Sequence, residues 1–333
     1  MSSAPAPDEI WKDARWLAQA VDPRAGLVRL VEMTPEAYRD ANFLDDRMLQ
    51  QPQTSHLLPW GDVSASEPSD ARSDARWIFH IGHVGSTLIA RLLGELEGVL
   101  SLREPRSLRD LAFFPKEVRA PFVPTVRALH SRTFGSGQKA LVKATSFVSE
   151  IASELMPNDG RGLYLYATPH SYISGILAGE NSRAELSALA ETRRQRLASR
   201  AIVLPDARSE AELAAAAWAC EMTALAAADG PNVLWADFDH ALSDMEGSLS
   251  HFADFLELEA EAQHLSQIAS GPLMRRYSKA TEFEYSPQLR RDLLNEAAGL
   301  HARDIESALA MLDRASETAP LLRKALDRAQ AES

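Results

Sequence analysis

Short runs of apolar residues alternate along the middle of the chain with stretches in which apolar residues recur at helical spacing. Four of these runs are mainly apolar and too short for typical helices, and they cover residues 77–81, 140–143, 162–166 and 232–235. A strand that is apolar on both faces is typical of a parallel sheet covered by helices on either side. The pattern therefore predicts a central parallel sheet.

Helical signals fill the intervals between these runs. Apolar spacing and capping residues predict helices at about residues 88–96, 183–200, 210–228 and 288–330. Ser182 with Glu185, and Ser209 with Glu212, have the spacing of capping boxes for two of them. We expect a solvated face, or alternatively an anionic acceptor site, from four arginines of the second helix: Arg193, Arg194, Arg196 and Arg200. Alternating strands and helices predict an α/β fold, a three-layer sandwich with C-terminal helices.

The first 76 residues have a different pattern, rich in loops and in helix signals. Thr34 followed by Pro35 marks a helix start, because a capping hydroxyl precedes a proline at the first helical position. Residues 61–74 are rich in Ser, Asp, Gly and Pro, which predicts a loop or linker. We therefore expect a helical N-terminal extension, residues 1–76, packed on an α/β domain, residues 77–333.

Charge and cysteine content narrow the class of partners. The 333 residues include 47 acidic and 35 basic side chains, for a net charge of −12, and such a surface repels nucleic-acid phosphates. Cys220 is the only cysteine, so no intrachain disulfide can form, which is usual in a reducing compartment. Its surroundings predict a buried thiol. The chain has neither a signal-peptide pattern nor a long apolar run. We expect a cytoplasmic protein with no nucleic-acid or membrane partner.

A loop of small residues follows the first apolar run and leads into a helix. Gly82 and Gly85 permit unusual backbone angles and a close approach of the main chain to a ligand. The N–H groups and dipole at a helix N-terminus favour an anion, and Ser86 and Thr87 add hydroxyl donors. The loop is therefore a candidate cradle for a phosphate or sulfate group, whereas His80 is expected to be a structural residue of the strand.

Two common nucleotide-binding fingerprints do not fit this loop. A Walker loop, Gly-x-x-x-x-Gly-Lys-[Ser/Thr], would require a glycine at His80 and a lysine at Ser86. Without that lysine, an ATP or GTP phosphoryl transferase lacks its main β/γ-phosphate clamp. The dinucleotide fingerprint Gly-x-Gly-x-x-Gly fails because its first glycine would also fall on His80.

A third family matches better. Residues 79–88, Phe-His-Ile-Gly-His-Val-Gly-Ser-Thr-Leu, resemble the phosphosulfate loop of the sulfotransferases, which reads roughly Pro-[Arg/Lys]-Ser-Gly-[Ser/Thr]-[Ser/Thr]. In that family the loop cradles the 5′-phosphate of 3′-phosphoadenosine 5′-phosphosulfate. Residues 85–87 match its second half, and His83 stands where the family has a basic residue that stabilises the leaving group. Gly82 replaces the proline and Val84 the serine.

The resemblance continues to about residue 260. Residues 99–106 resemble the family's strand after the first helix, and Glu104 stands where one branch has a glutamate that binds the acceptor or acts as base. Lys143 ends a segment similar to the next strand, which commonly carries a lysine. Residues 232–238 resemble the late strand. The resemblance thus implies that Glu104 is a general base, the alternative being pairing with a neighbouring arginine, and that Lys143 is a ligand contact.

The chain departs from the family at the site for the 3′-phosphate. The family signature reads Arg-Asp-Pro with a serine several residues later, but here the arginine is replaced by Ala167 and the serine by Gly175. Loss of a guanidinium from a phosphate site is a large change. Three polar neighbours are candidates to rebuild it: His170, Ser171 and Ser174. Otherwise the donor differs. Arg276, in a basic segment that resembles the family's C-terminal loop, is a candidate for the missing charge.

The resemblance implies a sulfotransferase-like variant of the P-loop fold that needs no metal ion. His83 and Glu104 are the expected catalytic residues. The expected donor-binding residues are Gly82, His83, Val84, Gly85, Ser86, Thr87, Lys143, Ser171, Ser174 and Arg276. The acceptor would be a hydroxyl or amine of a small molecule or peptide. Two alternatives stay open: an ATP- or GTP-dependent phosphotransferase in which Asp237 holds magnesium, and a non-catalytic protein that binds a nucleotide or another anion.

Overall fold

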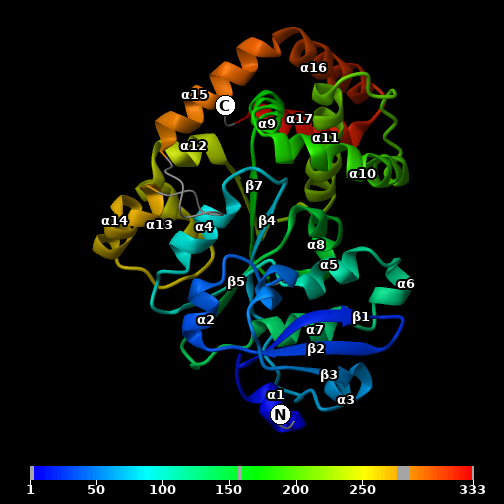
Figure 1. The fold of residues 1–333 in the computed structure, drawn as a ribbon. Coiled ribbons are helices and arrows are strands. Elements are labelled where there is room, and N and C mark those ends of the chain that lie inside the picture. Colours follow the sequence, from blue (N-terminus) through cyan, green and yellow to red (C-terminus); the bar gives the residue numbers. More distant parts are fainter. Residues whose placement is uncertain (1–3, 157–159, 276–285, 332–333) are drawn as a thin grey trace.

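A five-stranded parallel sheet with the order β5-β6-β4-β7-β8 forms the centre of the molecule (Figure 1). The computed structural model describes residues 4–156, 160–275 and 286–331. The strands of this sheet are β4 (Arg76–His80), β5 (Val99–Arg103), β6 (Lys139–Lys143), β7 (Gly162–Tyr166) and β8 (Val233–Asp237). Every neighbouring pair in it is parallel.

The strands form where the apolar runs allow burial on both faces. All residues of β4, β5 and β7 are buried, so each of their side chains packs against a helical layer on one face or the other. Trp77 and Phe79, which point to the same side of β4, stack with their ring centroids 5.7 Å apart. The predicted parallel sheet is confirmed, and its strands lie within one or two residues of the predicted runs.

Helices cover both faces of the sheet, which confirms the predicted three-layer arrangement. On one face, α4 lies against β4, β5 and β6, and the following helices pack beside it. In Figure 1 this layer is on the left of the sheet. It consists of α4 (Ser86–Leu93), α12 (Phe238–Ser243), α13 (Met245–Phe255), α14 (Ala262–Ser270) and the 3-10 helix η3 (Pro272–Arg275). The opposite layer consists of α5 (Arg106–Ala112), α6 (Lys116–Arg119), α7 (Val123–Ser131), the 3-10 helix η2 (Ser146–Ile151), α8 (Ala152–Leu155) and α11 (Glu210–Ala227).

The chain ends in helices, as the amphipathic pattern predicted, and the last two of them pack on α11. These C-terminal helices are α15 (Pro287–Leu300), α16 (Ala302–Ser316) and α17 (Pro320–Gln330). Together with α9 (Pro169–Leu177) and α10 (Glu180–Ser199) they form the upper part of the molecule in Figure 1. The predicted Ser209 cap is confirmed, because its hydroxyl accepts a hydrogen bond from the N–H of Glu212 at 3.2 Å.

The predicted start of α10 is wrong. This helix begins at Glu180 with Gly179 as its N-cap, so Ser182 lies in the first turn instead of capping it. The hydroxyl of Ser182 therefore does not cap the helix. Its Oγ lies 3.3 Å from Nδ1 of the His83 ring. The spacing of Ser182 and Glu185 alone could not show where the helix begins, because the helix extends further toward the N-terminus than this spacing predicts.

The prediction of a helical N-terminal region is also wrong in its main feature. Residues 4–65 include α1 (Pro7–Lys12), α2 (Pro35–Asp40), η1 (Asp46–Gln50) and α3 (Trp60–Ala65), but they are organised around an antiparallel sheet. Its strands are β1 (Trp16–Asp22), β2 (Leu27–Glu32) and β3 (Ser55–Pro59). Gly26 adopts a φ of +64° in the turn between β1 and β2. The predicted Thr34 cap of α2 is confirmed, with the Ala37 N–H 3.1 Å from the hydroxyl.

The N-terminal region is tied to the end of β5 by hydrogen bonds. The buried guanidinium of Arg103 donates to the carbonyls of Tyr38 and Ala41, each at 2.6 Å. The N–H of Leu44 in turn donates to the Arg103 carbonyl at 2.7 Å. These contacts fix residues 38–44 beside the residue that follows β5. Within the described ranges no helix is long and apolar enough to cross a membrane.

Candidate functional site

Polar residues collect where the parallel strands end, at one edge of the sheet. β4 leads into the loop at residues 81–85, β5 into Glu104, and Lys143 is the last residue of β6. β4 lies between β6 and β7. The connection from β4 to β5 therefore runs to one side of it, and the connection from β6 to β7 crosses to the other side. In open α/β sheets, ligands bind in the crevice outside the carboxyl ends of the strands at such a switch point.

The loop after β4 has a backbone suited to an anion. Gly82, His83 and Gly85 have φ values of +86°, +56° and +59°, and they turn the chain tightly into α4. A Cβ at Gly85 would overlap the ring of Phe238, so only glycine fits there. The N–H groups that open the helix, from Val84 to Thr87, donate to no acceptor within the described residues. These groups and the helix dipole can hold a phosphate or sulfate oxygen.

His80 fixes the start of the loop from inside β4. Its Nδ1 accepts a hydrogen bond from the Gly82 N–H at 2.9 Å, and its Nε2 lies 2.9 Å from the Ala144 carbonyl. Because Nδ1 accepts, Nε2 must carry the proton and donate, and the ring is held as the neutral tautomer. Its 5% exposure and these contacts agree with the structural role expected from the sequence.

Lys143 joins the loop to Glu104. The Lys143 Nζ lies 3.3 Å from the Thr87 hydroxyl oxygen and forms an ion pair with Oε1 of Glu104. The lysine is fully buried, and the glutamate side chain is 11% exposed. Glu104 itself has a left-handed φ of +56°, a conformation that costs a non-glycine residue about 1–3 kcal/mol and is common at functional sites. The expected alternative, in which Glu104 pairs with Arg103 or Arg106, is wrong. Arg103 donates to carbonyls of the N-terminal region, and Arg106 pairs with Asp46 and Asp110.

Arg47, which the sequence reasoning did not identify, also reaches Glu104. Its Nη2 lies 3.3 Å from Oε2 of Glu104 and 2.7 Å from Oδ2 of Asp45. The carboxylate therefore stands between two cations, one buried and one half-exposed. No sequence signal links Arg47 to Glu104, since the contact depends on how η1 lies against the end of β5.

His83 makes its contacts on the other side of the loop. Besides Ser182, its ring meets the Tyr172 ring edge to face, with centroids 6.4 Å apart. Tyr172 is buried on α9, and burial raises the pKa of its hydroxyl. These contacts place the His83 side chain beside α9 and α10. Its predicted catalytic role stays a prediction.

Charged side chains are buried behind Tyr172, between α9, α10 and α11. Arg193 is 6% exposed and Glu221 is 1% exposed. Burial raises the pKa of Glu221 to about 7, although nearby arginines oppose this shift. The solvated face expected for the α10 arginines is therefore wrong for Arg193. It is also wrong for Arg196, whose guanidinium stacks on Phe147 at 3.3 Å from the ring centroid.

A cavity of about 350 Å³ lies beside the loop, at the ends of β7 and β8. It is lined by His170, Ser171, Ser174, Asp239, Leu242, Ser243, Arg290, Arg291, Leu294 and Asn295. Ser171 donates to Oδ2 of Asp239, and the Arg290 Nε donates to Oδ1 at 2.8 Å. The Arg290 guanidinium also lies over the ring of Phe238, 5.0 Å from its centroid, and this ring packs on Gly85. The cavity is therefore adjacent to the loop.

The other predicted residues are placed less directly. Ser174 lines the same cavity, but its hydroxyl donates to the His170 carbonyl at 2.8 Å. Asp237 caps α12 by accepting from the His240 N–H at 2.9 Å, as a structural residue would. Arg276 lies outside the described residues. Within the described ranges no cluster of three or more His, Cys, Asp or Glu is arranged to hold a metal ion.

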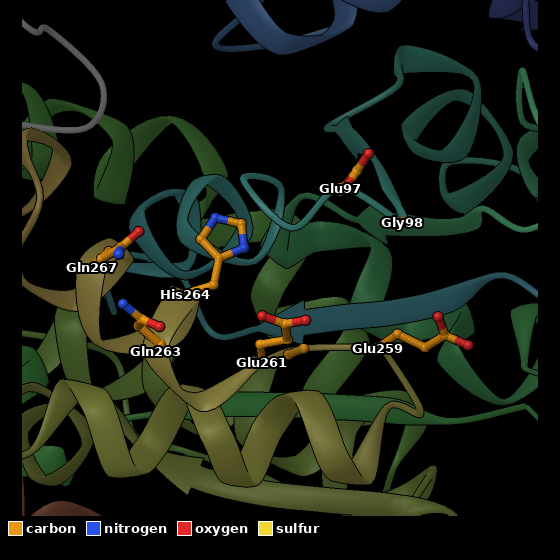
Figure 2. A pocket seen from close by; sticks show the side chains of 8 residues that line it. Glu97, Gly98, Glu259, Glu261, Gln263, His264 and Gln267 are labelled. Carbon is orange, nitrogen blue, oxygen red and sulfur yellow. The ribbon is translucent and has the colours of Figure 1, made fainter.

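A separate cavity of about 660 Å³ is unsuitable for an anion. Glu97 and Gly98, which line it, precede β5 and therefore lie at the edge of the sheet opposite the loop. Figure 2 shows Glu97, Glu259 and Glu261 around this hollow, with His264 of α14 beside them. Carboxylates of this density repel a phosphate or sulfate, so an anionic ligand is directed to the loop.

Comparison with known proteins gives structural neighbours only. No family model and no curated protein matches the chain. A sulfotransferase domain from the curacin biosynthetic pathway has a TM-score of 0.37 and 13% identity, covering 67% of this chain and 89% of its own. The mouse sulfotransferase SULT7A1 complexed with PAP has a TM-score of 0.39 and 12% identity, covering 78% and 90%. The sulfotransferase domain of the Synechococcus PCC 7002 olefin synthase has a TM-score of 0.37 and 14% identity, covering 69% and 89%. All three neighbours are sulfotransferases or sulfotransferase domains.

Proposed function

We propose that this protein transfers a sulfuryl group from 3′-phosphoadenosine 5′-phosphosulfate to a hydroxyl or amine of a small-molecule or peptide acceptor. The observation that carries the proposal is the buried chain of contacts from Thr87 through Lys143 to Glu104, next to an anion-binding loop. A cation that touches both the loop and a carboxylate suits group transfer, because it can stabilise the leaving oxygen while the carboxylate takes a proton.

Each residue of the site has a separate role in the proposed reaction. The bond from sulfur to the bridging phosphate oxygen breaks as a bond from sulfur to the acceptor oxygen or nitrogen forms. The loop N–H groups, Ser86 and Thr87 hold the 5′-phosphate. Lys143, together with His83, stabilises the electron pair that remains on the bridging oxygen. Glu104 accepts the proton that the acceptor loses.

The cavity beside α9 supports a donor with a second phosphate. It places Ser171 next to Arg290 at the strand end where the family's arginine is replaced by Ala167. Asp239 is neutralised by Arg290, and Arg291 adds a further positive charge to the lining. A guanidinium supplied by α15 would thus replace the one missing from the segment after β7.

Calorimetric titration with 3′-phosphoadenosine 5′-phosphate tests the proposal. We expect micromolar binding, weakened about tenfold in Thr87→Ala, since one hydrogen bond to a charged ligand is worth roughly 1.4 kcal/mol. Thr318→Ala, at an exposed position between α16 and α17, is the matched control and should bind like the wild type. Failure of the wild-type protein to bind would contradict the proposal.

The same titration with ATP separates the two alternatives. ATP binding that requires magnesium, with no binding of the bisphosphate, would favour a phosphotransferase in which Asp237 exchanges its capping role for metal binding. Bisphosphate binding without sulfuryl transfer, unchanged in His83→Ala and Glu104→Ala, would favour a non-catalytic anion-binding protein. Weak, magnesium-independent ATP binding is the result expected from the absence of a lysine at Ser86.

A further inference from the structure

Arg47 brings the N-terminal region into the proposed active site. It belongs to η1, whereas Lys143 and Glu104 belong to the α/β domain. Its side chain is 50% exposed, and its Nη2 lies 3.3 Å from Oε2 of Glu104, whose side chain is 11% exposed. Arg47 therefore covers the solvent side of a carboxylate whose inner oxygen is paired with the buried lysine.

The guanidinium is held firmly in this position. Its Cζ lies 3.4 Å from the centroid of the Phe43 ring, the geometry of a stacked cation–π contact. The Nε donates to both carboxylate oxygens of Asp45, at 2.9 and 3.1 Å, and the Nη2 donates to Oδ2 at 2.7 Å. Burial alone would raise the pKa of Asp45, but its hydrogen bonds with Arg47 bring it below the usual value. Because Phe43 and Asp45 fix the arginine, its contact with Glu104 does not depend on a freely moving side chain.

A bound anion would separate two of the partners of Lys143. Its Nζ contacts the Thr87 hydroxyl in the first turn of α4 as well as Glu104. An anion held by the loop lies next to Thr87 and competes with Glu104 for the ammonium group. As the lysine turns to the anion, Glu104 loses its inner cation, and only a second contact can keep the carboxylate in place.

We propose that Arg47 is a positioning residue for Glu104, which it holds in place when an anion at the loop draws Lys143 away. The inference rests on the proposed function, since the anion is the 5′-phosphate of the donor. Arg47 acts through Glu104 and does not contact the donor. With Arg47 absent, Lys143 is the one cation left to Glu104 within the described part of the chain, and Glu104 retains it more strongly, so anion binding weakens.

A double-mutant cycle on the full-length protein tests this coupling with the probe 3′-phosphoadenosine 5′-phosphate. Calorimetry gives Kd for the wild type, Arg47→Gln, Glu104→Gln and the double variant. We expect Arg47→Gln to weaken binding about three- to tenfold, the size of one charge-assisted hydrogen bond. Glu104→Gln should tighten binding about tenfold, because Lys143 is released and a negative charge is removed. In the Glu104→Gln background, adding Arg47→Gln should change Kd less than about twofold, because the contact through which it acts is gone.

Two further variants are controls for the double-mutant cycle. Arg15→Gln removes an arginine from the same N-terminal region, where it pairs with Glu32, and should leave Kd unchanged. Arg47→Lys keeps the charge but loses the hydrogen bonds to both carboxylate oxygens of Asp45, so it should give an intermediate Kd. It replaces Arg47→Gln if that variant unfolds below the assay temperature.

The outcomes separate the inference from the proposed function. An Arg47→Gln effect that persists in the Glu104→Gln background would mean that Arg47 acts on the ligand directly, and would overturn the inference. Equal Kd values for the wild type and Arg47→Gln would also overturn it while leaving the proposed function intact. No binding to the wild type would refute the proposed function, and the inference with it.

Discussion

Replacing Gly85 by alanine tests how closely the anion-binding loop packs on α12. Gly85 has a φ of +59°, and a Cβ built on it would overlap the ring of Phe238. That ring is 1% exposed and lies under the guanidinium of Arg290, so it cannot move into solvent without breaking other contacts. Gly26 provides the matched control, because its φ of +64° is similar but no heavy atom lies within 4 Å of its Cβ position.

The expected costs follow from these two surroundings. A left-handed backbone costs an L-residue about 1–2 kcal/mol, offset by about 0.4–1 kcal/mol because alanine restricts the unfolded chain. Gly26→Ala should therefore lower the free energy of unfolding by about 1 kcal/mol, and by at most about 1.6 kcal/mol. Gly85→Ala carries the same backbone cost and adds roughly 1–3 kcal/mol for a methyl group forced into packed side chains.

Urea unfolding followed by tryptophan fluorescence measures both variants. The difference between them, about 1–3 kcal/mol, isolates the overlap with Phe238 from the backbone cost. Phe238→Leu provides room for the methyl group, so Gly85→Ala should cost less in that background than in the wild type. Equal destabilisation by Gly85→Ala and Gly26→Ala, or no relief by Phe238→Leu, would show that the loop does not pack on α12 as described.

Three other perturbations have defined outcomes. The pKa of Glu221 is raised from 4.5 to about 7, so its burial costs stability as pH rises between these values. Glu221→Gln should match the wild type at about pH 4 and gain up to about 3 kcal/mol by pH 8. A pH-independent difference in urea unfolding would contradict this. Arg103→Met should lower the free energy of unfolding by roughly 3 kcal/mol, because buried carbonyls of the N-terminal region lose their donor. A decrease below about 1 kcal/mol in the same urea unfolding assay would show that those contacts contribute little. Burial raises the pKa of Cys220 to about 12, so the native thiol should not react with a disulfide reagent until urea unfolds the protein. Rapid labelling of the native state would be inconsistent with that burial.

The parallel sheet could be predicted from the sequence because its signal is local. An unbroken apolar run reports burial on both faces without reference to any partner strand, and β7 was located to the residue in this way. The loop after β4 was equally accessible, since glycines and hydroxyl residues at the start of a helix have a local physical meaning. The antiparallel N-terminal sheet was not predicted, although the sequence carries a signal for it. Buried Val28 and Leu30 alternate with half-buried Arg29, and this period-two pattern is typical of a strand.

The site contacts could not be predicted because they depend on which strands are neighbours. Glu104 meets Lys143 since β5 pairs with β6 in a register that sets Arg103 opposite Lys143, and nothing in either segment specifies that register. Arg47 depends in addition on a loop-rich region folding against β5. The inward-facing arginines of α10 and its C-cap could have been predicted. Arg193, Arg196 and Arg200 recur at spacings of three and four residues, which is the pattern of a single face that packs inward.

The strand order also fixes how a donor would lie across the crevice. On one side of β4, at the ends of β5 and β6, Glu104 can exchange a proton beside the cation Lys143. On the other side, at the ends of β7 and β8, the cavity offers Ser171 and Arg290, where the one carboxylate, that of Asp239, is already paired. A ligand with a reacting group at one end and a second anionic group at the other would bind with the reacting group toward Glu104. The reverse orientation would place the acceptor proton beside a neutralised carboxylate and the second anion beside the proposed base, so charge alone selects between the two.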